Sequence, residues 1–332
     1  MRRLSFIPLL VMLAVLCTAL PSAARAPIAI GISDPRGGNL AVLDQHIKQV
    51  GVKPALWALW SNWGSRGGSG VCRATAGSCS FPSATANELL KRGITPVIWW
   101  QPVDPARPAN RRYNSFKRIA QGKHDAYIFA WAKALRQVSK NNGNRSVVVR
   151  FAHEASGNWF PWSIGKAGNT VKNYKAAWRR IDRIFRQAGA RNNTKFLWSN
   201  LMPSRRHYPG DRYVDYIGAT VMNYGKARQW RSMNKVVTKV VSRARKFSRK
   251  PIFLAEVGSS HRGGNKAGWI RTGYLQVYKR FPQVRAIMYL DSNAPALRVK
   301  HPDWRLAKAS GPSAVAAYRA IAKSPKFRGR IR

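Results

Sequence analysis

A buried strand runs into a polar, aromatic loop in the stretch Val-Val-Val-Arg-Phe-Ala-His-Glu-Ala-Ser-Gly-Asn-Trp-Phe-Pro-Trp, residues 147–162. Its three valines follow the turn-forming sequence Asn-Asn-Gly-Asn of residues 141–144, as is typical of a strand in a sheet that is covered on both faces. His153 and Glu154 stand where polar chemistry begins, and several indole and phenyl rings follow within eight residues. Because a pyranose stacks on aromatic rings while its hydroxyls bond charged groups, the stretch predicts a sugar-binding cleft.

Glutamate is scarce, which makes each position informative. The 332 residues contain three, Glu88, Glu154 and Glu256. Glu88 falls in a helical pattern over residues 83–93 and is expected on the surface. Glu256 closes a second apolar run, residues 251–256. Two of the three glutamates therefore stand at the ends of predicted strands, although a lone glutamate at such a place more often only caps a core strand.

Eight apolar runs alternate with helical patterns along the chain. The predicted strands are residues 28–33, 55–60, 94–100, 147–154, 195–199, 216–222, 251–256 and 286–290. Helical stripes cover residues 124–138, 171–185, 236–247, 269–281 and 313–321. This alternation predicts an α/β fold, a (β/α)8 TIM barrel that forms a single domain over residues 25–332.

A barrel of this kind places its chemistry at the carboxyl ends of the strands. Glu154 ends the fourth predicted strand, Tyr224 follows the sixth and Glu256 ends the seventh. Strand alternation places residues 150, 152 and 154 on one side of the sheet, and residues 252, 254 and 256 likewise. If that side is the interior, the two carboxylates converge. Arg150 is then a charge in an apolar interior that requires a carboxylate, and Glu256 is the natural partner.

The chain is strongly basic, with 59 Lys and Arg against 12 Asp and Glu and a net charge of +47. Such a surface attracts polyanions. The charge either serves an anionic substrate or wall polymer or reflects a host with basic secreted proteins, and the sequence favours neither. No motif specifies a nucleic-acid site.

Residues 1–24 have the features of a secretory signal peptide: Arg2 and Arg3, an apolar segment over residues 7–20, and the small residues Ser22-Ala23-Ala24. Its removal leaves a charge of +45. We expect a secreted or periplasmic protein without a membrane span. Cys72 and Cys79 then form an even pair that predicts a short disulfide loop. No Cys/His spacing suggests a metal site, and we expect no cofactor and a monomer.

These motifs resemble glycoside hydrolase family 26, which is best known for β-mannanases. That family carries its acid/base in a His-Glu pair at strand four, matched here by His153-Glu154 with Gly157, Trp159, Phe160, Pro161 and Trp162 behind it. Its nucleophile lies in a Pro-x-x-x-x-Glu-x-Gly-Ser run, matched by residues 251–259. The stretch from residue 119 to Ala132 also resembles the family's approach to strand four, and the resemblance extends from about residue 90 to residue 321.

The resemblance implies a retaining endo-β-glycosidase in which Glu154 is the acid/base and Glu256 the nucleophile. It implies that His153 binds substrate in the cleft. From their positions in the sequence, Trp159, Trp162, Tyr224 and Arg150 are expected to bind substrate or to support the site. A purely structural role stays open for His153 and for Tyr224. Ser156 stands where the family commonly has Asn, so mannose does not follow as the sugar. Trp63, Trp99 and Trp100 fit either core packing or sugar stacking.

Two functions compete. The first is a secreted enzyme that hydrolyses a β-linked polysaccharide, mannanase-like and open to an acidic exopolysaccharide as substrate. The second is a non-catalytic protein that binds a polyanion or cell-wall glycan on a TIM-barrel scaffold. The two converging glutamates favour the enzyme, because a binder has no need of paired carboxylates on so basic a surface.

Overall fold

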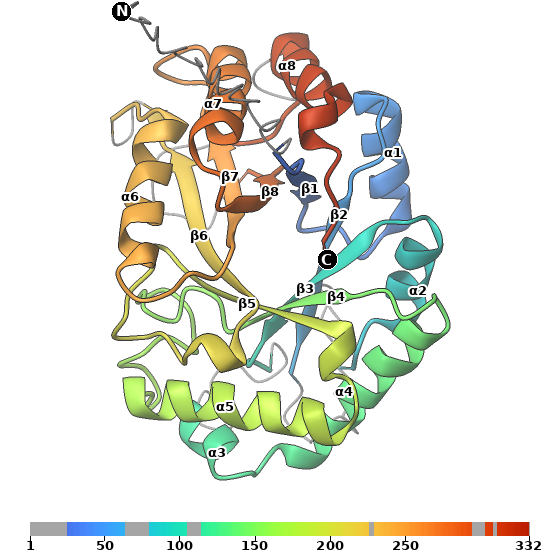
Figure 1. Ribbon diagram of the computed structural model, residues 1–332, viewed down its shortest axis with the longest axis vertical. Coiled ribbons are helices and arrows are strands. Elements are labelled where there is room, and N and C mark those ends of the chain that lie inside the picture. Colours follow the sequence, from blue (N-terminus) through green and yellow to red (C-terminus); the bar gives the residue numbers. More distant parts are fainter. Residues whose placement is uncertain are drawn as a thin grey trace, which may run out of the picture.

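The computed structural model describes residues 25–63, 80–104, 114–225, 229–293, 303–307 and 311–331. The predicted signal peptide and the predicted Cys72–Cys79 pair lie outside these residues. Eight parallel strands close into a barrel in the order β1 to β8, and helices surround it (Figure 1). The predicted (β/α)8 fold is confirmed.

The strands are β1 (Ala29–Ser33), β2 (Leu56–Asn62), β3 (Thr95–Gln101), β4 (Val147–Phe151), β5 (Thr194–Asn200), β6 (Tyr216–Asn223), β7 (Ile252–Ser259) and β8 (Val284–Leu290). The α-helices are α1 (Leu40–Val50), α2 (Ser83–Lys91), α3 (Phe116–Ala120), α4 (Asp125–Lys140), α5 (Val171–Gln187), α6 (Met233–Arg245), α7 (Lys266–Arg280) and α8 (Gly311–Lys323). In the described parts of the chain, none of these helices has the length and hydropathy needed to cross a bilayer.

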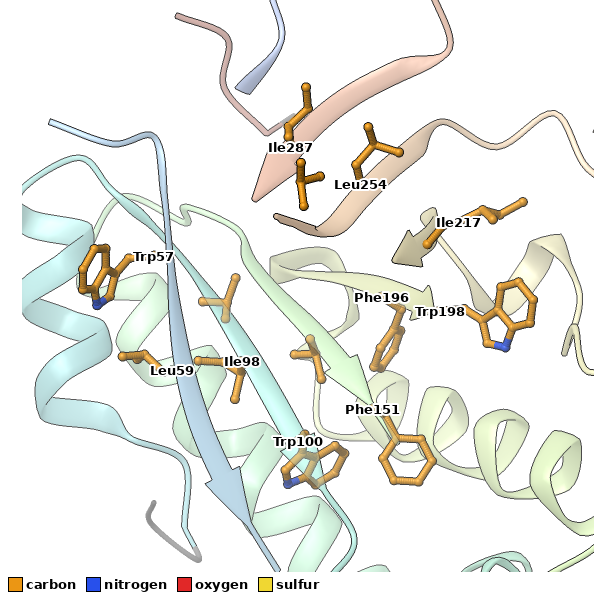
Figure 2. Close-up of a cluster of buried hydrophobic side chains, with 14 of the residues drawn as sticks. Trp57, Leu59, Ile98, Trp100, Phe151, Phe196, Trp198, Ile217, Leu254 and Ile287 are labelled. Carbon is orange, nitrogen blue, oxygen red and sulfur yellow. The ribbon is translucent and has the colours of Figure 1, made fainter. Parts of the chain in front are cut away.

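Two apolar clusters hold the barrel together. The inner cluster is made almost wholly of strand residues: Ala29, Leu56, Ala58, Val97, Trp99, Val148, Leu197, Tyr216, Phe253, Ala255, Ala286 and Met288. The outer cluster joins the other faces of the strands to the helices, and Figure 2 shows part of it, including Trp57, Trp100, Phe151 and Trp198. Because both faces of the sheet are covered, the strand sequences are continuous apolar runs and do not alternate between apolar and polar residues.

β4 ends at Phe151, so the predicted strand end at Glu154 is wrong by three residues. Ala152 and Glu154 have φ angles of +45° and +52°, in the left-handed region that non-glycine residues rarely adopt. Ala152 packs in the outer cluster, so it does not share a side with Arg150 as strand alternation predicted. A tight turn, and not a continued strand, therefore carries Glu154.

β7 continues three residues beyond Glu256, and a β-bulge orients that side chain. Leu254 and Glu256 pair with consecutive residues of β6, which leaves Ala255 as an extra residue. Leu254 belongs to the outer cluster, and the predicted common side of residues 252, 254 and 256 is wrong. The bulge shifts the alternation by one residue, so Glu256 faces Arg150 in the interior.

Candidate active site

The turn after β4 is clamped to both neighbouring strands. The amide of Ala152 donates to the carbonyl of Trp100 on β3 at 3.0 Å, and the amide of Glu154 donates to the carbonyl of Ser199 on β5 at 2.9 Å. These bonds hold two residues in a strained backbone conformation. They fix the Glu154 carboxyl at the mouth of the barrel.

The Glu154 carboxyl is buried and has two neutral donors. The hydroxyl of Thr220 on β6 donates to its Oε1. The indole Nε1 of Trp159 donates to its Oε2 at 3.2 Å. Burial, and after it the negative charge of Glu256, raise the pKa of Glu154 to about 7, against the lowering effects of these bonds and of the charge of Arg150. A large share of Glu154 is therefore protonated at neutral pH.

Glu256 has a cation as its partner. Arg150 is completely buried, and its Nη1 lies 2.7 Å from Oε1 of Glu256, so the predicted pairing of these two residues is present. The rest of the guanidinium is also satisfied: Nε and Nη2 donate to the Ser199 hydroxyl at 2.9 and 2.7 Å, and the group lies 4.2 Å from the ring centroid of Trp99. Arg150 thus fixes the position of the Glu256 side chain through a buried ion pair.

Thr220 connects the two carboxyl groups. Its hydroxyl bonds Glu154, and its backbone pairs in register with Glu256. The two glutamates therefore share the same rim of the barrel, close enough for the charge of Glu256 to act on the pKa of Glu154. One carboxyl that retains its proton beside one that is paired with a cation is the division needed for an acid and a nucleophile.

His153 is surrounded by aromatic rings. Its ring centroid is 5.0 Å from that of Trp99, 4.6 Å from that of Phe160 and 5.3 Å from that of Trp162. Burial, and then the charge of Arg150, lower the pKa of His153 well below its usual value, so the imidazole is neutral. It can exchange hydrogen bonds but carries no positive charge.

Trp162 is one of the rings around His153. Its side chain is buried at 3% exposure, and its Nε1 donates to the carbonyl of His153 at 2.9 Å. Its ring stacks on that of Phe160, with 4.4 Å between the ring centroids and an angle of 8° between the planes. It therefore has a supporting position rather than an open face for a sugar.

Trp159 is the large exposed aromatic of the site, at 44% exposure. A Cβ on Gly157 would lie 2.5 Å from its ring, so the absence of a side chain there lets the indole cross the backbone and reach Glu154. Tyr224, after β6, is partly exposed, and its ring centroid is 5.7 Å from that of Trp304. Trp63, Trp99 and Trp100 are buried, which resolves their open assignment in favour of packing.

Sequence reasoning did not identify Thr220, Ser199 or Trp60. Trp60 is partly exposed, with its ring 4.0 Å from that of Trp99. Ser199 lies at the carboxyl end of an apolar run and Thr220 lies within one, and hydroxyl residues are common at both kinds of position, so neither residue stood out in the sequence. Across the part of the chain that the structure describes, no group of three or more His, Cys, Asp or Glu is placed to hold a metal ion.

Comparisons with known proteins show which family the sequence matches. The Glycosyl hydrolase family 26 model matches residues 114–257, a span that includes both glutamates. Endoglucanase H of Acetivibrio thermocellus is 35% identical over 246 residues, which cover 70% of this chain and 25% of the relative. The chain thus spans about a quarter of the length of that relative.

Solved structures of low sequence identity share the fold. The Bacillus subtilis mannanase BCman is 18% identical with a TM-score of 0.59, over 88% of this chain and 85% of that chain. A Cellulomonas fimi endo-β-1,4-mannanase double mutant is 15% identical with a TM-score of 0.60, over 91% of this chain and 71% of that chain.

We predict that Thr220→Val raises the pKa of Glu154 above the value of about 7, because the mutation removes a donor that favours the ionised carboxyl. Thr220→Ser, which keeps the hydroxyl, should leave the pKa near the wild-type value. Glutamate labelled with ¹³C at the side-chain carboxyl gives only three signals in this chain, so the titration can be followed by NMR. A pKa in Thr220→Val at or below that of the wild type would contradict the assignment.

We predict that Arg150→Met lowers the free energy of unfolding by about 3–5 kcal/mol, because Glu256 and Ser199 lose a buried partner. Arg186→Met is the matched control. It removes a partly exposed arginine from an ion pair of similar length, and the buried Asp182 keeps Arg191 as a second partner, so the loss should stay under about 1 kcal/mol. Urea unfolding measures both, and equal losses in the two variants would be inconsistent with a central role for Arg150.

Proposed function

We propose that this chain, a member of glycoside hydrolase family 26 by its match over residues 114–257, is a retaining endo-β-glycosidase acting through Glu154 and Glu256. The observation that carries the proposal is the unlike environment of two carboxyl groups on one rim. Glu154 is buried, accepts hydrogen bonds from neutral donors, and has a pKa raised to about 7, whereas Glu256 forms an ion pair with Arg150. This difference supports Glu154 as the acid and Glu256 as the nucleophile.

In the first step, Glu154 donates its proton to the glycosidic oxygen as the bond from that oxygen to the anomeric carbon breaks. The carboxylate of Glu256 attacks the same carbon, and a covalent glycosyl ester forms. In the second step, ionised Glu154 takes a proton from a water molecule whose oxygen attacks the anomeric carbon. The ester bond to Glu256 breaks, the carboxylate is restored, and the sugar keeps its β configuration.

A polysaccharide is the substrate class that fits this site. Trp159 offers an exposed ring beside Glu154, on which a pyranose can stack, and the relative named above is an endoglucanase while the structural neighbours are mannanases. The net charge of +47 supports an acidic polysaccharide among the candidates. The sequence of residues 1–24 supports secretion or a periplasmic location, and we propose that the enzyme works there as a monomer.

The second candidate is a non-catalytic protein that binds an anionic glycan, and the basic surface is the observation that favours it. Salt-sensitive binding is common to both functions. Release of reducing ends belongs only to the enzyme, so the two are separated by assaying hydrolysis and binding on the same preparation.

We predict that Glu154→Gln and Glu256→Gln each lose at least about 10²–10⁴-fold in activity while remaining folded. Glu88→Gln is the matched control, because Glu88 lies on α2 in a surface pair with Arg92 and should leave activity unchanged. Reducing-end release measures activity, and circular dichroism checks folding.

Azide separates the two roles. With Glu256→Ala, azide should restore cleavage of an activated β-glycoside and give an α-glycosyl azide, because it replaces the nucleophile directly. With Glu154→Ala, azide should attack the intermediate and give the β product. If Glu256→Ala gave the β-glycosyl azide and Glu154→Ala the α-glycosyl azide, the two roles would be exchanged. Near-normal turnover of either glutamine variant would contradict the mechanism.

We predict that a panel of neutral mannan, mixed-linkage glucan and an acidic bacterial polysaccharide identifies at least one polymer that is cut internally. Internal cleavage appears as a fast fall in viscosity for few new reducing ends, whereas exo action gives monosaccharide with little change in viscosity. If the panel is bound in a salt-sensitive way but never cut, the non-catalytic function replaces the enzyme.

A further inference from the structure

A cavity, here called the second cavity to distinguish it from the site of the two glutamates, lies at the opposite end of the barrel from them. It has a volume of about 500 Å³. Its lining comes from the segments that enter the barrel: Ala26 and Pro27 before β1, Tyr216 at the start of β6, Pro251 before β7, and Pro282 and Gln283 before β8. Because all strands are parallel, this end is the far side of the molecule from the turn after β4.

Four arginines line this cavity, and its lining contains no Asp or Glu: Arg245, Arg249, Arg285 and Arg330. Arg245 is fixed in place, since its Nη1 donates to the carbonyls of Ser248 and Lys250, each at 3.0 Å. Burial, and then the charge of Arg249, lower the pKa of Arg245. The Arg245 and Arg249 guanidinium groups thus repel each other, and an anion placed beside them would relieve the repulsion.

The basic composition of the chain does not by itself produce such a cavity. Asp182 binds both Arg186 and Arg191, and a larger cavity beside β1 and β8 contains Asp34 and Asp291 together with Arg36 and Arg305. Among the described residues, the four arginines of the second cavity have no ion pair with a carboxylate. The 12 acidic residues of the chain are thus placed elsewhere.

The cationic surface continues past this cavity. A smaller one of about 220 Å³ shares Gly329 and Arg330 with it and adds Lys53 and Arg328, again with no acidic residue in the lining. The segment around Gly329 therefore runs between two hollows that both carry positive charge. A ligand with several anionic groups can contact both.

We propose that this surface binds the carboxylate groups of an acidic polysaccharide and so anchors the protein at the end of the barrel that faces away from Glu154 and Glu256. Guanidinium groups match carboxylates in a planar, two-bonded geometry. Tyr216 and the prolines give the cavity apolar walls against which the body of a sugar ring can pack. A hollow with such walls fits a single acidic sugar unit better than the phosphate ridge of a nucleic acid. The binding does not depend on hydrolysis, and it leaves the catalytic rim open.

The test compares two triple variants of equal charge. The first is Arg249→Gln/Arg285→Gln/Arg330→Gln, in which each side chain is exposed. The control is Lys117→Gln/Lys133→Gln/Arg183→Gln, which removes three exposed cations from α3, α4 and α5. Binding to polygalacturonate, and to polygalacturonate with its carboxyls methyl-esterified, is measured by co-sedimentation at low and physiological salt. Hydrolysis of the best neutral soluble substrate is measured in parallel.

We expect the first triple variant to bind polygalacturonate about tenfold more weakly than the wild type, and the control variant to stay within about twofold. The esterified polymer should bind weakly to all three proteins. Hydrolysis of the neutral substrate should be unchanged in both variants, so a failure of this proposal leaves the catalytic proposal intact.

Equal loss of binding in the two variants would overturn the proposal, because bulk charge alone would then explain retention. No loss in either variant would also overturn it. Single-stranded DNA serves as a polyphosphate probe. If it binds as tightly as polygalacturonate and depends on the same three arginines, the preference for carboxylate sugars is wrong.

Discussion

Two carboxyl groups share one rim of this barrel, and only one of them has a cation. Arg150 is completely buried and gives its charge to Glu256, while its remaining donors are used by Ser199. Glu154 receives bonds from Thr220 and Trp159, which are neutral. Burial, and then the charge of Glu256, raise the pKa of Glu154 to about 7, and the proposed chemistry depends on the proton that this carboxyl keeps.

The backbone places these groups through two local irregularities. Ala152 and Glu154 adopt left-handed φ angles in a turn that is bonded to β3 and β5, and a bulge at Ala255 rotates Glu256 inward. Regular strands would have left Glu256 on the helix side of the sheet, with Leu254. Strain and bulges of this kind persist when the surrounding structure overdetermines them, here through a barrel that is packed on both faces.

Much of this could be predicted from the sequence. The β-branched and apolar runs predicted the eight strands, because parallel strands buried on both faces need such residues, and the scarcity of glutamate singled out residues 154 and 256. The pairing of Arg150 with Glu256 followed from the cost of burying a lone charge. The face of the sheet on which residues 152, 252 and 254 lie was predicted wrongly. The prediction assumed regular strands in which side chains alternate between the two faces, and no residue type in the sequence marks the turn or the bulge. The sequence also did not identify Thr220 and Trp60 as residues of the site, because both take part in it through neighbours that are distant in sequence.

The two ends of the barrel differ in charge as well as in shape. The rim with the two glutamates pairs its buried arginine with a carboxylate, whereas the cavity at the opposite end is lined, among the described residues, by four arginines and no carboxylate. The central claim, that Glu256 attacks the anomeric carbon while Glu154 supplies the proton, is tested most directly by trapping the intermediate. A 2-deoxy-2-fluoro glycosyl fluoride of the preferred sugar should form one covalent adduct, and peptide mapping by mass spectrometry should place it on Glu256. An adduct on Glu154, or hydrolysis of the substrate by a route that leaves Glu256 unlabelled, would contradict the account.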